Sequence, residues 1–226
     1  LQNRVAISGC IMSAYRPFEF PPTQLLETDA VLRALVPAHR YLAELKGLAR
    51  SIPNEGLLIS TLSLQEAQSS SEIENIITTQ DALYKYQIQP QNADPVSKEV
   101  AHYAQGLHIG FRQVRDSGLL TLNTMLAVQA ALEGNDAGFR KTPGTMLKSE
   151  QSGAVVYEPP SPLLVPGLMA ELERFIHADS TLDPLVKMAL IHHQFETIHP
   201  FYDGNGRTGR IINVLNTYAK APAASS

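Results

Sequence analysis

Apolar residues recur at helical spacing along most of the chain. The first run extends from Leu25 to Leu48, and Pro37 within it is expected to give a helical hairpin or a bent helix. The same spacing in three later segments predicts further helices, and the last of them ends at Gly134, a residue type favoured at helix C-termini. These segments are residues 62–79, 97–114 and 122–132. The pattern predicts a mainly helical protein.

One segment has the pattern of strands. Residues 145–157 carry β-branched and apolar residues on both sides of a polar turn that contains glycine, which predicts a short hairpin. A proline-rich connector then leads into the helical pattern GLMAELERFI. Asp183 and Pro184 suit the cap and the first position of a further helix. That helix must end near His199, because Pro200 disfavours the α conformation in the residue before it.

The composition is that of an ordinary globular protein, because 44% of the 226 residues are hydrophobic and 18% are charged. The 18 basic residues do not outnumber the 22 acidic residues, so nucleic acid is disfavoured as the main partner. Cys10 is the single cysteine, which excludes an intramolecular disulfide and favours a cytoplasmic location. The sequence lacks a run of about 18 apolar residues, so we expect no membrane association. Nothing in it indicates an oligomeric state.

Residues 199–210, HPFYDGNGRTGR, contain a candidate anion site. Gly204, Asn205 and Gly206 allow a tight turn whose successive amide N–H groups converge on one point. A helix is predicted directly after them, and a helix N-terminus favours bound anions. Taken alone, GNG is more often a simple turn, so the neighbouring residues decide the interpretation.

Four polar side chains surround this candidate site. Arg207 and Arg210 are three positions apart in the first helical turn, where both could face one phosphate group. Asp203 supplies a hard oxygen ligand of the kind that magnesium prefers beside a polyphosphate. His199 is the only base in the segment that could take a proton from an incoming hydroxyl. Together these residues predict a phosphoryl- or nucleotidyl-transfer site.

The segment resembles the signature of the Fic family, HPFx(D/E)GNGRxxR, at every specified position. The resemblance extends from near Phe20 to Tyr218 and includes PNEGLLIS, LQEAQSSSEIENI, GFRKTPG and AVVYEPPSPLLVPGLMAELERFI. It implies an all-α fold, a Fic-type helical bundle with a short β-hairpin flap. It also implies an N-terminal helical region that carries an inhibitory helix, a catalytic core and a tail. We expect these over residues 1–95, 96–220 and 221–226.

The resemblance further implies a protein adenylyltransferase, which moves AMP from ATP onto a serine, threonine or tyrosine hydroxyl of a target protein or of the enzyme itself. By resemblance, His199 is the general base, Phe201 a buried anchor of the loop and Asp203 the magnesium ligand. A phosphorylating branch of the family departs from the signature in its GNGR portion, so the intact GNGR here favours AMP transfer. The expected phosphate-binding residues are Gly204, Asn205, Gly206, Arg207 and Arg210.

By the same resemblance, the hairpin would be a flap that pairs along its edge with an extended target segment. Val155, Val156 and Tyr157 are the expected contacts with the target. The same three residues suit an ordinary core strand equally well, so both interpretations stay open.

Residues 70–75, SSEIEN, fit the inhibitory motif of Fic proteins, (S/T)xxxE(G/N), so Ser70, Glu74 and Asn75 are candidate inhibitory residues. The implied mechanism is a pairing of Glu74 with Arg210 that keeps the γ-phosphate of ATP from its productive position. The alternative is a capping box of the pattern S-x-x-E, in which Glu74 would bond back to the start of its own helix. We favour inhibition, because the helical pattern of LSLQEAQ upstream places Glu74 inside the helix.

Three other functions compete with AMP transfer. His192, Glu196 and His199 are spaced so that they could bind zinc on one helical face, but Pro200 moves His199 out of the helix and the HExxH pattern is absent. A second alternative is a non-catalytic nucleotide-binding interaction module, although nothing in the loop is degenerate. A third is the removal of AMP from a modified protein, a direction that the sequence does not separate from transfer.

Overall fold

The computed structural model describes residues 20, 26–49, 55–89, 91, 94–149 and 152–220 of the chain. Within these residues the protein consists of eight α-helices and one two-stranded antiparallel hairpin. The all-α fold class predicted from the sequence is therefore confirmed. Cys10 and the predicted tail over 221–226 lie outside the described residues.

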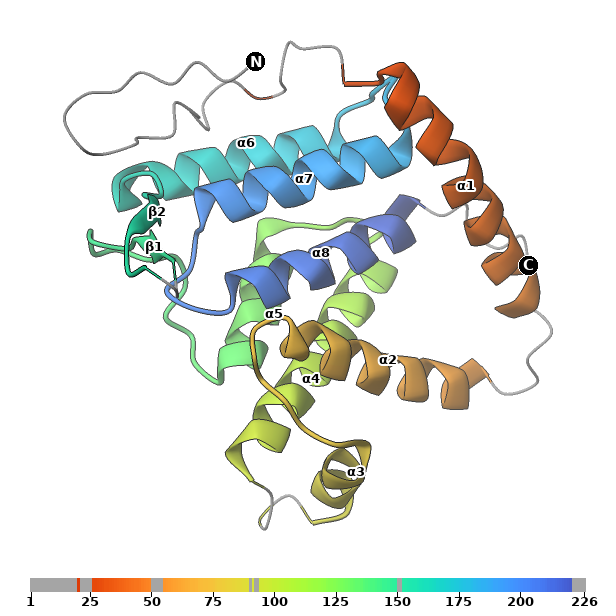
Figure 1. Cartoon of the computed structure of the whole chain (residues 1–226), viewed down its shortest axis with the longest axis vertical. Helices are drawn as coiled ribbons and strands as arrows, with labels where there is room; N and C mark the ends of the chain where they lie inside the picture. Colours follow the sequence, from red (N-terminus) through yellow and green to blue (C-terminus); the bar gives the residue numbers. More distant parts are fainter. Residues whose placement is uncertain are drawn as a thin grey trace.

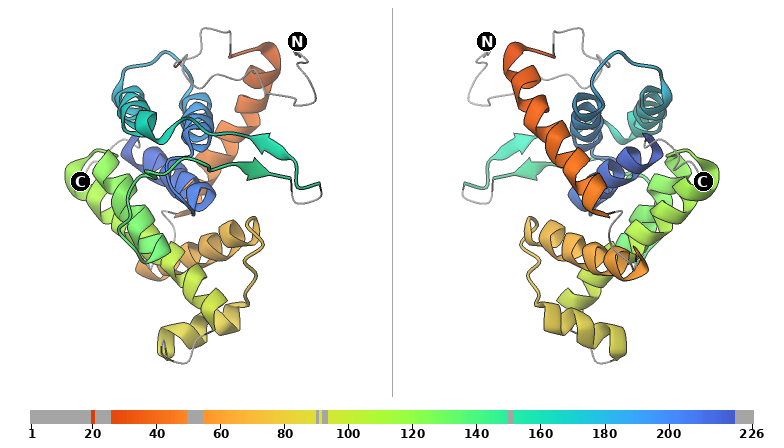
Figure 2. Two further views of the ribbon diagram at one scale, coloured as in Figure 1. Left: turned by 90° about the vertical axis from the view of Figure 1, so that its left-hand side faces the viewer. Right: turned by 90° about the vertical axis from the view of Figure 1, so that its right-hand side faces the viewer.

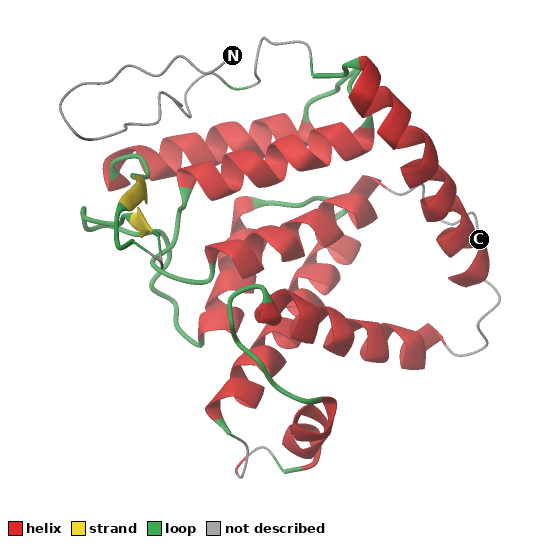
Figure 3. Ribbon diagram, viewed as in Figure 1, coloured by secondary structure: helices red, strands yellow, loops and turns green. Residues whose placement is uncertain are grey.

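The helices and the hairpin alternate with short loops, as Figure 3 shows. The hairpin strands are β1 (Leu147–Lys148) and β2 (Val155–Tyr157), and a short 3-10 helix, η2 (Pro162–Leu164), follows them. The helices are α1 (Asp29–Ala49), α2 (Glu55–Glu72), α3 (Gln80–Ile88), α4 (Pro95–Ser117), α5 (Leu122–Glu133), α6 (Val165–His177), α7 (Pro184–Ile198) and α8 (Asn205–Lys220).

Helix α4 is the centre of the packing, and it contacts α2, α3, α5 and α8 (Figure 1). Helix α7 packs against both α6 and α8. The buried side chains of these helices form one hydrophobic core, in which Tyr103, Phe195 and Phe201 are the largest fully buried residues. Since α7 and α8 are consecutive and packed together, the loop between them is fixed against the core at both ends.

Two helices begin as their capping residues predict. Asp183 Oδ1 accepts a hydrogen bond from the Leu185 N–H at 2.9 Å, and Pro184 occupies the first helical position of α7. Thr121 caps α5 in the same way. The predicted stop at Gly134 is also confirmed, because this glycine ends α5 in the left-handed conformation with a φ of 65°.

Two predicted helical segments differ from the structure. Residues 29–49 form one uninterrupted helix, so Pro37 does not divide the run into a helical hairpin, the first of the two forms expected. A proline removes one backbone donor and crowds the preceding turn, but α1 is largely exposed, which gives its backbone room to adjust. The segment predicted as one helix over 62–79 consists of the end of α2, a break over 73–79 and the approach to α3. Asn75, whose backbone is left-handed, lies near the start of this break.

The hairpin projects from the helical body in the segment between α5 and α6 (Figure 2). Leu147 lies opposite Tyr157 and Lys148 opposite Val155, with an irregular register between the two pairs. Both strands fall inside the predicted range of 145–157, so the predicted hairpin is confirmed. Across the described ranges, every helix is too short or too polar to cross a bilayer.

Candidate active site

His199 is the residue at which α7 ends. Its backbone is left-handed, with φ of 48° and ψ of 62°, and its N–H donates to the Phe195 carbonyl at 3.0 Å. Pro200 explains the end of the helix, because the residue before a proline is disfavoured in the right-handed α conformation. The predicted helix end is therefore confirmed. The imidazole is carried on a packed helix end and lines a cleft.

The loop after His199 is anchored by Phe201 and Asn205. The Phe201 ring is fully buried, and its centroid lies 5.6 Å from that of Phe139 and 6.1 Å from that of Phe195. The Asn205 side chain accepts from the Phe201 N–H at 2.9 Å and donates to the Phe201 carbonyl at 3.0 Å. The Asn205 side chain thus holds the loop together, and its backbone N–H is left for an anion.

Helix α8 begins with a turn suited to an anion. Gly204 has a φ of 72°, a conformation that favours glycine, and a Cβ here would displace the ends of the Leu132 and Glu133 side chains of α5. The Thr208 N–H donates to the Gly204 carbonyl at 2.9 Å and begins the bonding of the helix. The N–H groups of residues 205–207 therefore have no intrahelical acceptor, and they lie at the positive end of the helix dipole.

The motif loop opens into a cleft of about 450 Å³. Its walls come from the loop itself, from the segment after α2, from α4 and from the first strand of the hairpin. The predicted base, the predicted metal ligand and the glycine-rich turn therefore line one cavity. The lining residues are Glu74, Ile76, Glu99, Thr145, Met146, Leu147, His199, Tyr202, Asp203, Gly204, Asn205, Gly206 and Arg207.

Arg210 is engaged by the C-terminal end of α2. Its Nη2 donates to Glu74 Oε1 at 2.7 Å and to the Ser70 carbonyl at 3.0 Å, and its Nε donates to Ser70 Oγ at 2.6 Å. Glu74 Oε1 also lies so close to Gly206 that a Cβ at this glycine would clash with it. The Glu74 carboxylate therefore lies over the first turn of α8, at the position suited to an anion.

The way in which α2 ends places Glu74. The Asn75 N–H donates to the Glu72 carbonyl and the Ile76 N–H to the Ser71 carbonyl, each at 3.0 Å, and this pair of bonds defines a Schellman motif. Asn75 has a φ of 61°, a conformation that asparagine tolerates better than most residues. One expectation is corrected, because Glu74 follows the end of α2 and does not lie inside the helix. The disfavoured alternative, a capping box, does not form at a helix C-terminus.

Arg207 does not share a partner with Arg210. Its side chain is 4% exposed, and its Nη1 donates to Glu99 Oε1 at 2.6 Å and its Nη2 to Glu133 Oε1 at 3.1 Å. Burial raises the pKa of Glu133, and the charge of Arg207 opposes that rise. The two arginines expected to face one phosphate are therefore held by different carboxylates, and Arg207 links α8 to α4 and α5.

The surroundings of His199 favour a neutral imidazole. Burial lowers the pKa of His199 below its usual value of 6.5, and the positive charge of Arg140 also lowers it, whereas Asp203 and Glu74 act in the opposite sense. Its Nδ1 is buried without a hydrogen-bond partner among the described residues. The neutral form is the one that accepts a proton, so this environment suits a general base.

Asp203 lies exposed at the rim of the cleft, and its Oδ1 accepts from the Gly204 N–H at 2.7 Å. Magnesium is commonly bound by one or two carboxylates and completed by phosphate oxygens and water. The described part of the chain has no cluster of three or more metal-binding side chains. A single carboxylate beside an anion site fits magnesium brought by a nucleotide, whereas the alternative zinc site at His192, Glu196 and His199 is not supported.

The three flap residues differ in their surroundings. Val155 and Val156 are 45% and 61% exposed. Tyr157 is half-buried, and its hydroxyl donates to the Thr197 carbonyl at 2.8 Å. The two valines are thus accessible to a partner, while Tyr157 attaches the hairpin to α7. Contact between these residues and a target stays a prediction.

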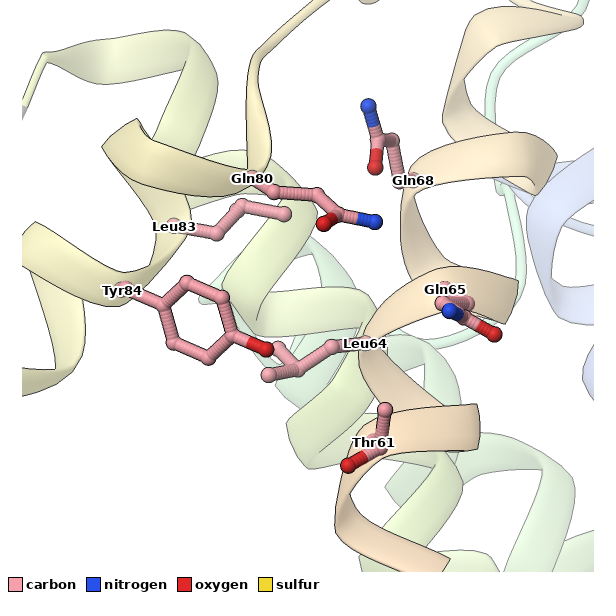
Figure 4. A pocket seen from close by; sticks show the side chains of 7 residues that line it. All are labelled: Thr61, Leu64, Gln65, Gln68, Gln80, Leu83 and Tyr84. Atoms are coloured by element: carbon pink, nitrogen blue, oxygen red, sulfur yellow. The ribbon is translucent and has the colours of Figure 1, made fainter. Parts of the chain in front are cut away.

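The described residues enclose two further hollows near α2. The first lies between α2 and α3 beside Gln65, Gln68 and Tyr84 (Figure 4), and at about 20 Å³ it has room for little more than a water molecule. The second, of about 590 Å³, is a groove lined by side chains such as Leu62 and Phe111. Neither includes a residue of the glycine-rich turn, so the cleft at the motif loop is the candidate active site.

Three charged residues that build the site are not indicated by the sequence pattern. Arg140 is buried and donates to the His199 carbonyl at 2.7 Å, while Glu99 and Glu133 hold Arg207. All three act on residues far away in the sequence, and spacing within a single element does not encode such contacts. The one available indication for Arg140 is its place in GFRKTPG, a stretch that contributes to the family resemblance.

Comparison with known proteins agrees with this geometry. The family model described as "Fic/DOC family N-terminal" matches residues 32–112, and the one described as "Fic/DOC family" matches residues 119–216. The chain belongs to the Fic/DOC family. Two relatives of this Fic protein carry the name protein adenylyltransferase. The Aquifex aeolicus protein, named as probable, is 43% identical over 56 residues, and the Drosophila melanogaster protein is 45% identical over 61 residues.

These matches are partial on both sides. The first covers 25% of this chain and 18% of the Aquifex protein. The second covers 26% of this chain and 12% of the Drosophila protein. The matched segments therefore represent less than a fifth of either relative's own length.

Solved Fic structures share the fold over a larger part of the chain. A Fic family protein from Desulfovibrio desulfuricans superposes with a TM-score of 0.69 at 23% identity and covers 89% of this chain and 61% of that one. A Fic domain containing signalling protein from Bacteroides thetaiotaomicron gives a TM-score of 0.63 at 20% identity, over 72% of this chain and 64% of that one. At these identities the likeness concerns the fold alone.

Proposed function

We propose that this Fic protein is a protein adenylyltransferase whose activity is restrained by Glu74. The observation that supports this best is the convergence in one cleft of the His199 imidazole, the anion-binding start of α8 and a carboxylate lying over that start. The names of the two relatives point to the same chemistry. Because the matches cover so little of those relatives, the activity of this chain is a proposal.

In the proposed reaction a serine, threonine or tyrosine hydroxyl of a target protein attacks the α-phosphorus of ATP. The His199 imidazole takes the hydroxyl proton, the new P–O bond joins AMP to the target, and the bond from the α-phosphorus to its bridging oxygen breaks to release pyrophosphate. The N–H groups at the start of α8 would stabilise charge on the α-phosphate. Magnesium held at Asp203 would offset charge on the pyrophosphate.

Restraint by Glu74 follows from the partners of Arg210. A γ-phosphate bound at Arg210 would need the guanidinium that Ser70 and Glu74 now engage. It would also meet the Glu74 carboxylate beside Gly206, and two anions in one place repel each other. ATP is therefore expected to bind productively only after Glu74 has left the start of α8.

The deciding experiment uses ATP labelled at either the α or the γ phosphate, with magnesium, and the Glu74→Gly variant as both enzyme and acceptor. We expect the α label to become protein-bound and the γ label to remain in solution, with the mass of AMP added at a hydroxyl. Incorporation of the γ label would contradict AMP transfer. Release of AMP from a previously modified protein, without any incorporation, would favour the removal reaction instead.

A further inference from the structure

Three successive carbonyl groups around His199 accept hydrogen bonds from one residue, Arg140. Its Nη2 donates to the Ile198 carbonyl at 3.3 Å, its Nε to the His199 carbonyl at 2.7 Å and its backbone N–H to the Pro200 carbonyl at 2.9 Å. The last carbonyl groups of a helix have no intrahelical donor, so they need partners from elsewhere. Arg140 therefore fixes the backbone on both sides of His199.

Both stems of the hairpin take part in this arrangement. Arg140 precedes β1, and its Nη2 also donates to the carbonyl of Pro160, which follows β2. Tyr157, the last residue of β2, donates its hydroxyl to the Thr197 carbonyl at 2.8 Å. Directional hydrogen bonds thus connect the hairpin to the turn that carries His199.

Arg140 is buried, so the placement of hydrogen-bond acceptors around its guanidinium determines whether the charge is tolerated. The residue is 3% exposed, and a buried cation is tolerated only where hydrogen bonds replace its hydration. The partners of its guanidinium described above are all carbonyl oxygens. A planar guanidinium reaches several such oxygens at fixed angles, whereas a lysine ammonium is a single point donor.

The backbone of His199 needs support of this kind. Its φ of 48° lies in the left-handed region, which is disfavoured for a residue with a Cβ. Such conformations persist when surrounding contacts over-determine them, and they concentrate at functional sites. The bond from Arg140 to the carbonyl of His199 itself is a contact of this type.

We propose that Arg140 is a positioning residue that holds the His199 imidazole at the cleft and couples it to the hairpin. The effect of Arg140 on the rate of AMP transfer rests on the proposed function, whereas its effect on the backbone of His199 does not. When the hairpin pairs with a target segment, the stem bonds of Arg140 and Tyr157 keep the base aligned with the hydroxyl that the segment presents.

The kinetic test replaces Arg140 by lysine in the Glu74→Gly background, where the proposed restraint is released. We expect kcat for AMP transfer to fall about ten- to a hundredfold, because a misplaced base slows the chemical step. KM for ATP should change less than about twofold, since no phosphate contact is lost. Arg112→Lys, the same substitution at an exposed site of α4, is the matched control and should change neither constant. An unchanged kcat per folded molecule, or equal losses of kcat and ATP affinity, would overturn the proposal.

A second test needs no activity. Amide hydrogen exchange at His199 and Phe201 should become about tenfold faster or more in Arg140→Lys, while exchange in α5 stays the same. Tyr157→Phe removes a single hydroxyl and should have a smaller effect at the same amides, which keeps the test decisive if Arg140→Lys fails to fold. Unchanged exchange at His199 in both variants would overturn the proposal. If the Glu74→Gly protein modifies no acceptor, the proposed function fails, and exchange still decides the role of Arg140.

Discussion

Glu74 and Arg210, 136 positions apart in the sequence, form an ion pair with 2.7 Å between Oε1 and Nη2. The two side chains are 41% and 20% exposed, so the pair is partly removed from water and is less screened than a fully exposed pair. Ser70 supplies two further acceptors to the same guanidinium. This engagement can compete with a phosphate for Arg210, and it is open to reversal because it involves no covalent change.

Removal of Glu74 should release this restraint. A charge-assisted hydrogen bond contributes about 1.5–3 kcal/mol, so Glu74→Gly should improve productive ATP binding by about ten- to a hundredfold. The measurement is the initial rate of α-label incorporation, including self-modification. Glu72→Gln is the control, because it removes an acidic charge two positions away and adds no glycine to the last turn of α2.

The double variant Glu74→Gly with Arg210→Ala separates release of Arg210 from a general loosening of the α2 end. If the gain depends on Arg210, it should disappear in the double variant, since Arg210 is needed to use the vacated position. A rise in rate that survives the loss of Arg210 would contradict the pairing as the cause. A folded, ATP-binding Glu74→Gly protein with no rise at all would leave Glu74 as a structural residue.

Ser70→Ala should give a weaker release than Glu74→Gly. The substitution removes the Oγ acceptor at 2.6 Å from Arg210 Nε, but the Ser70 carbonyl and the Glu74 carboxylate still hold Nη2. We expect a rise in AMP transfer of about two- to tenfold, because a typical hydrogen bond contributes about 0.5–1.5 kcal/mol net and the other contacts of Arg210 remain. Ser69→Ala, at the neighbouring position, should leave the rate unchanged. Equal rates for both alanine variants would show that Ser70 Oγ does not restrain Arg210.

Local chemistry explains what could be predicted from the sequence. The ends of α7 follow from Asp183, Pro184 and Pro200, each of which acts on its immediate neighbours. The glycine-rich turn and the helix after it follow in the same way. The end of α2 could also have been predicted, because asparagine is a residue type that favours the left-handed position of a Schellman motif. The helical spacing around Asn75 predicted a longer helix instead.

The rest depends on long-range contacts. From its spacing, Arg207 is expected to face the same phosphate as Arg210. In the structure its guanidinium instead donates hydrogen bonds to Glu99 and Glu133, which lie on two other helices. Arg140 lies in an irregular stretch whose spacing carries no periodic pattern, and its role becomes visible only when the hairpin stems meet the end of α7. Tertiary packing decides which residues pair across long distances in the sequence. A local pattern does not show whether a charged side chain binds such a partner or stays exposed to solvent.

Asp203→Ala should weaken nucleotide binding only when magnesium is present. The carboxylate is exposed at the rim of the cleft, and its loss removes an oxygen ligand without disturbing the core. Titration of ATP in the Glu74→Gly background, with magnesium and with EDTA, should show a loss of about tenfold or more in the first case and little change in the second. If the Asp203→Ala substitution leaves the affinity for ATP with magnesium unchanged, the metal site must lie elsewhere.

The pH dependence of transfer should report the pKa of His199. Burial and Arg140 lower that pKa below 6.5, so the active neutral base should persist into mildly acidic solution. The acidic limb of the kcat/KM profile of Glu74→Gly, which reports the free enzyme, should therefore have its midpoint below 6.5, the more so because Glu74, which raises the pKa, is gone. Asp203 is the remaining charged side chain that raises it.

Adding Arg140→Gln to the Glu74→Gly variant should move that midpoint upward, because a positive charge that opposes the imidazolium is lost. Lys141→Gln removes the neighbouring exposed cation and serves as the control. A midpoint above 6.5 in the Glu74→Gly protein, or no shift with Arg140→Gln, would contradict this electrostatic picture of His199.

Glu196 should make the stability of the protein fall as the pH rises. Its Oε1 is buried without a hydrogen-bond partner among the described residues, close to Gly209 of α8. Burial raises the pKa of Glu196 from 4.5 to about 7, with a smaller contribution from Glu74 and opposition from Arg210. The folded protein therefore holds a proton that the unfolded chain releases, so stability present below pH 4.5 is lost as the pH rises through about 7.

Glu196→Gln keeps a neutral side chain of the same shape at every pH, so it should remove this dependence. The free energy of unfolding of the variant, relative to the unmodified protein, should rise by up to about 3 kcal/mol between about pH 4.5 and 8, since each pKa unit corresponds to about 1.4 kcal/mol. Urea unfolding at the two pH values provides the measurement, and Glu171→Gln, at an exposed position of α6, is the control and should show no such change. A difference between Glu196→Gln and the unmodified protein that is the same at both pH values would show that the carboxyl of Glu196 titrates normally.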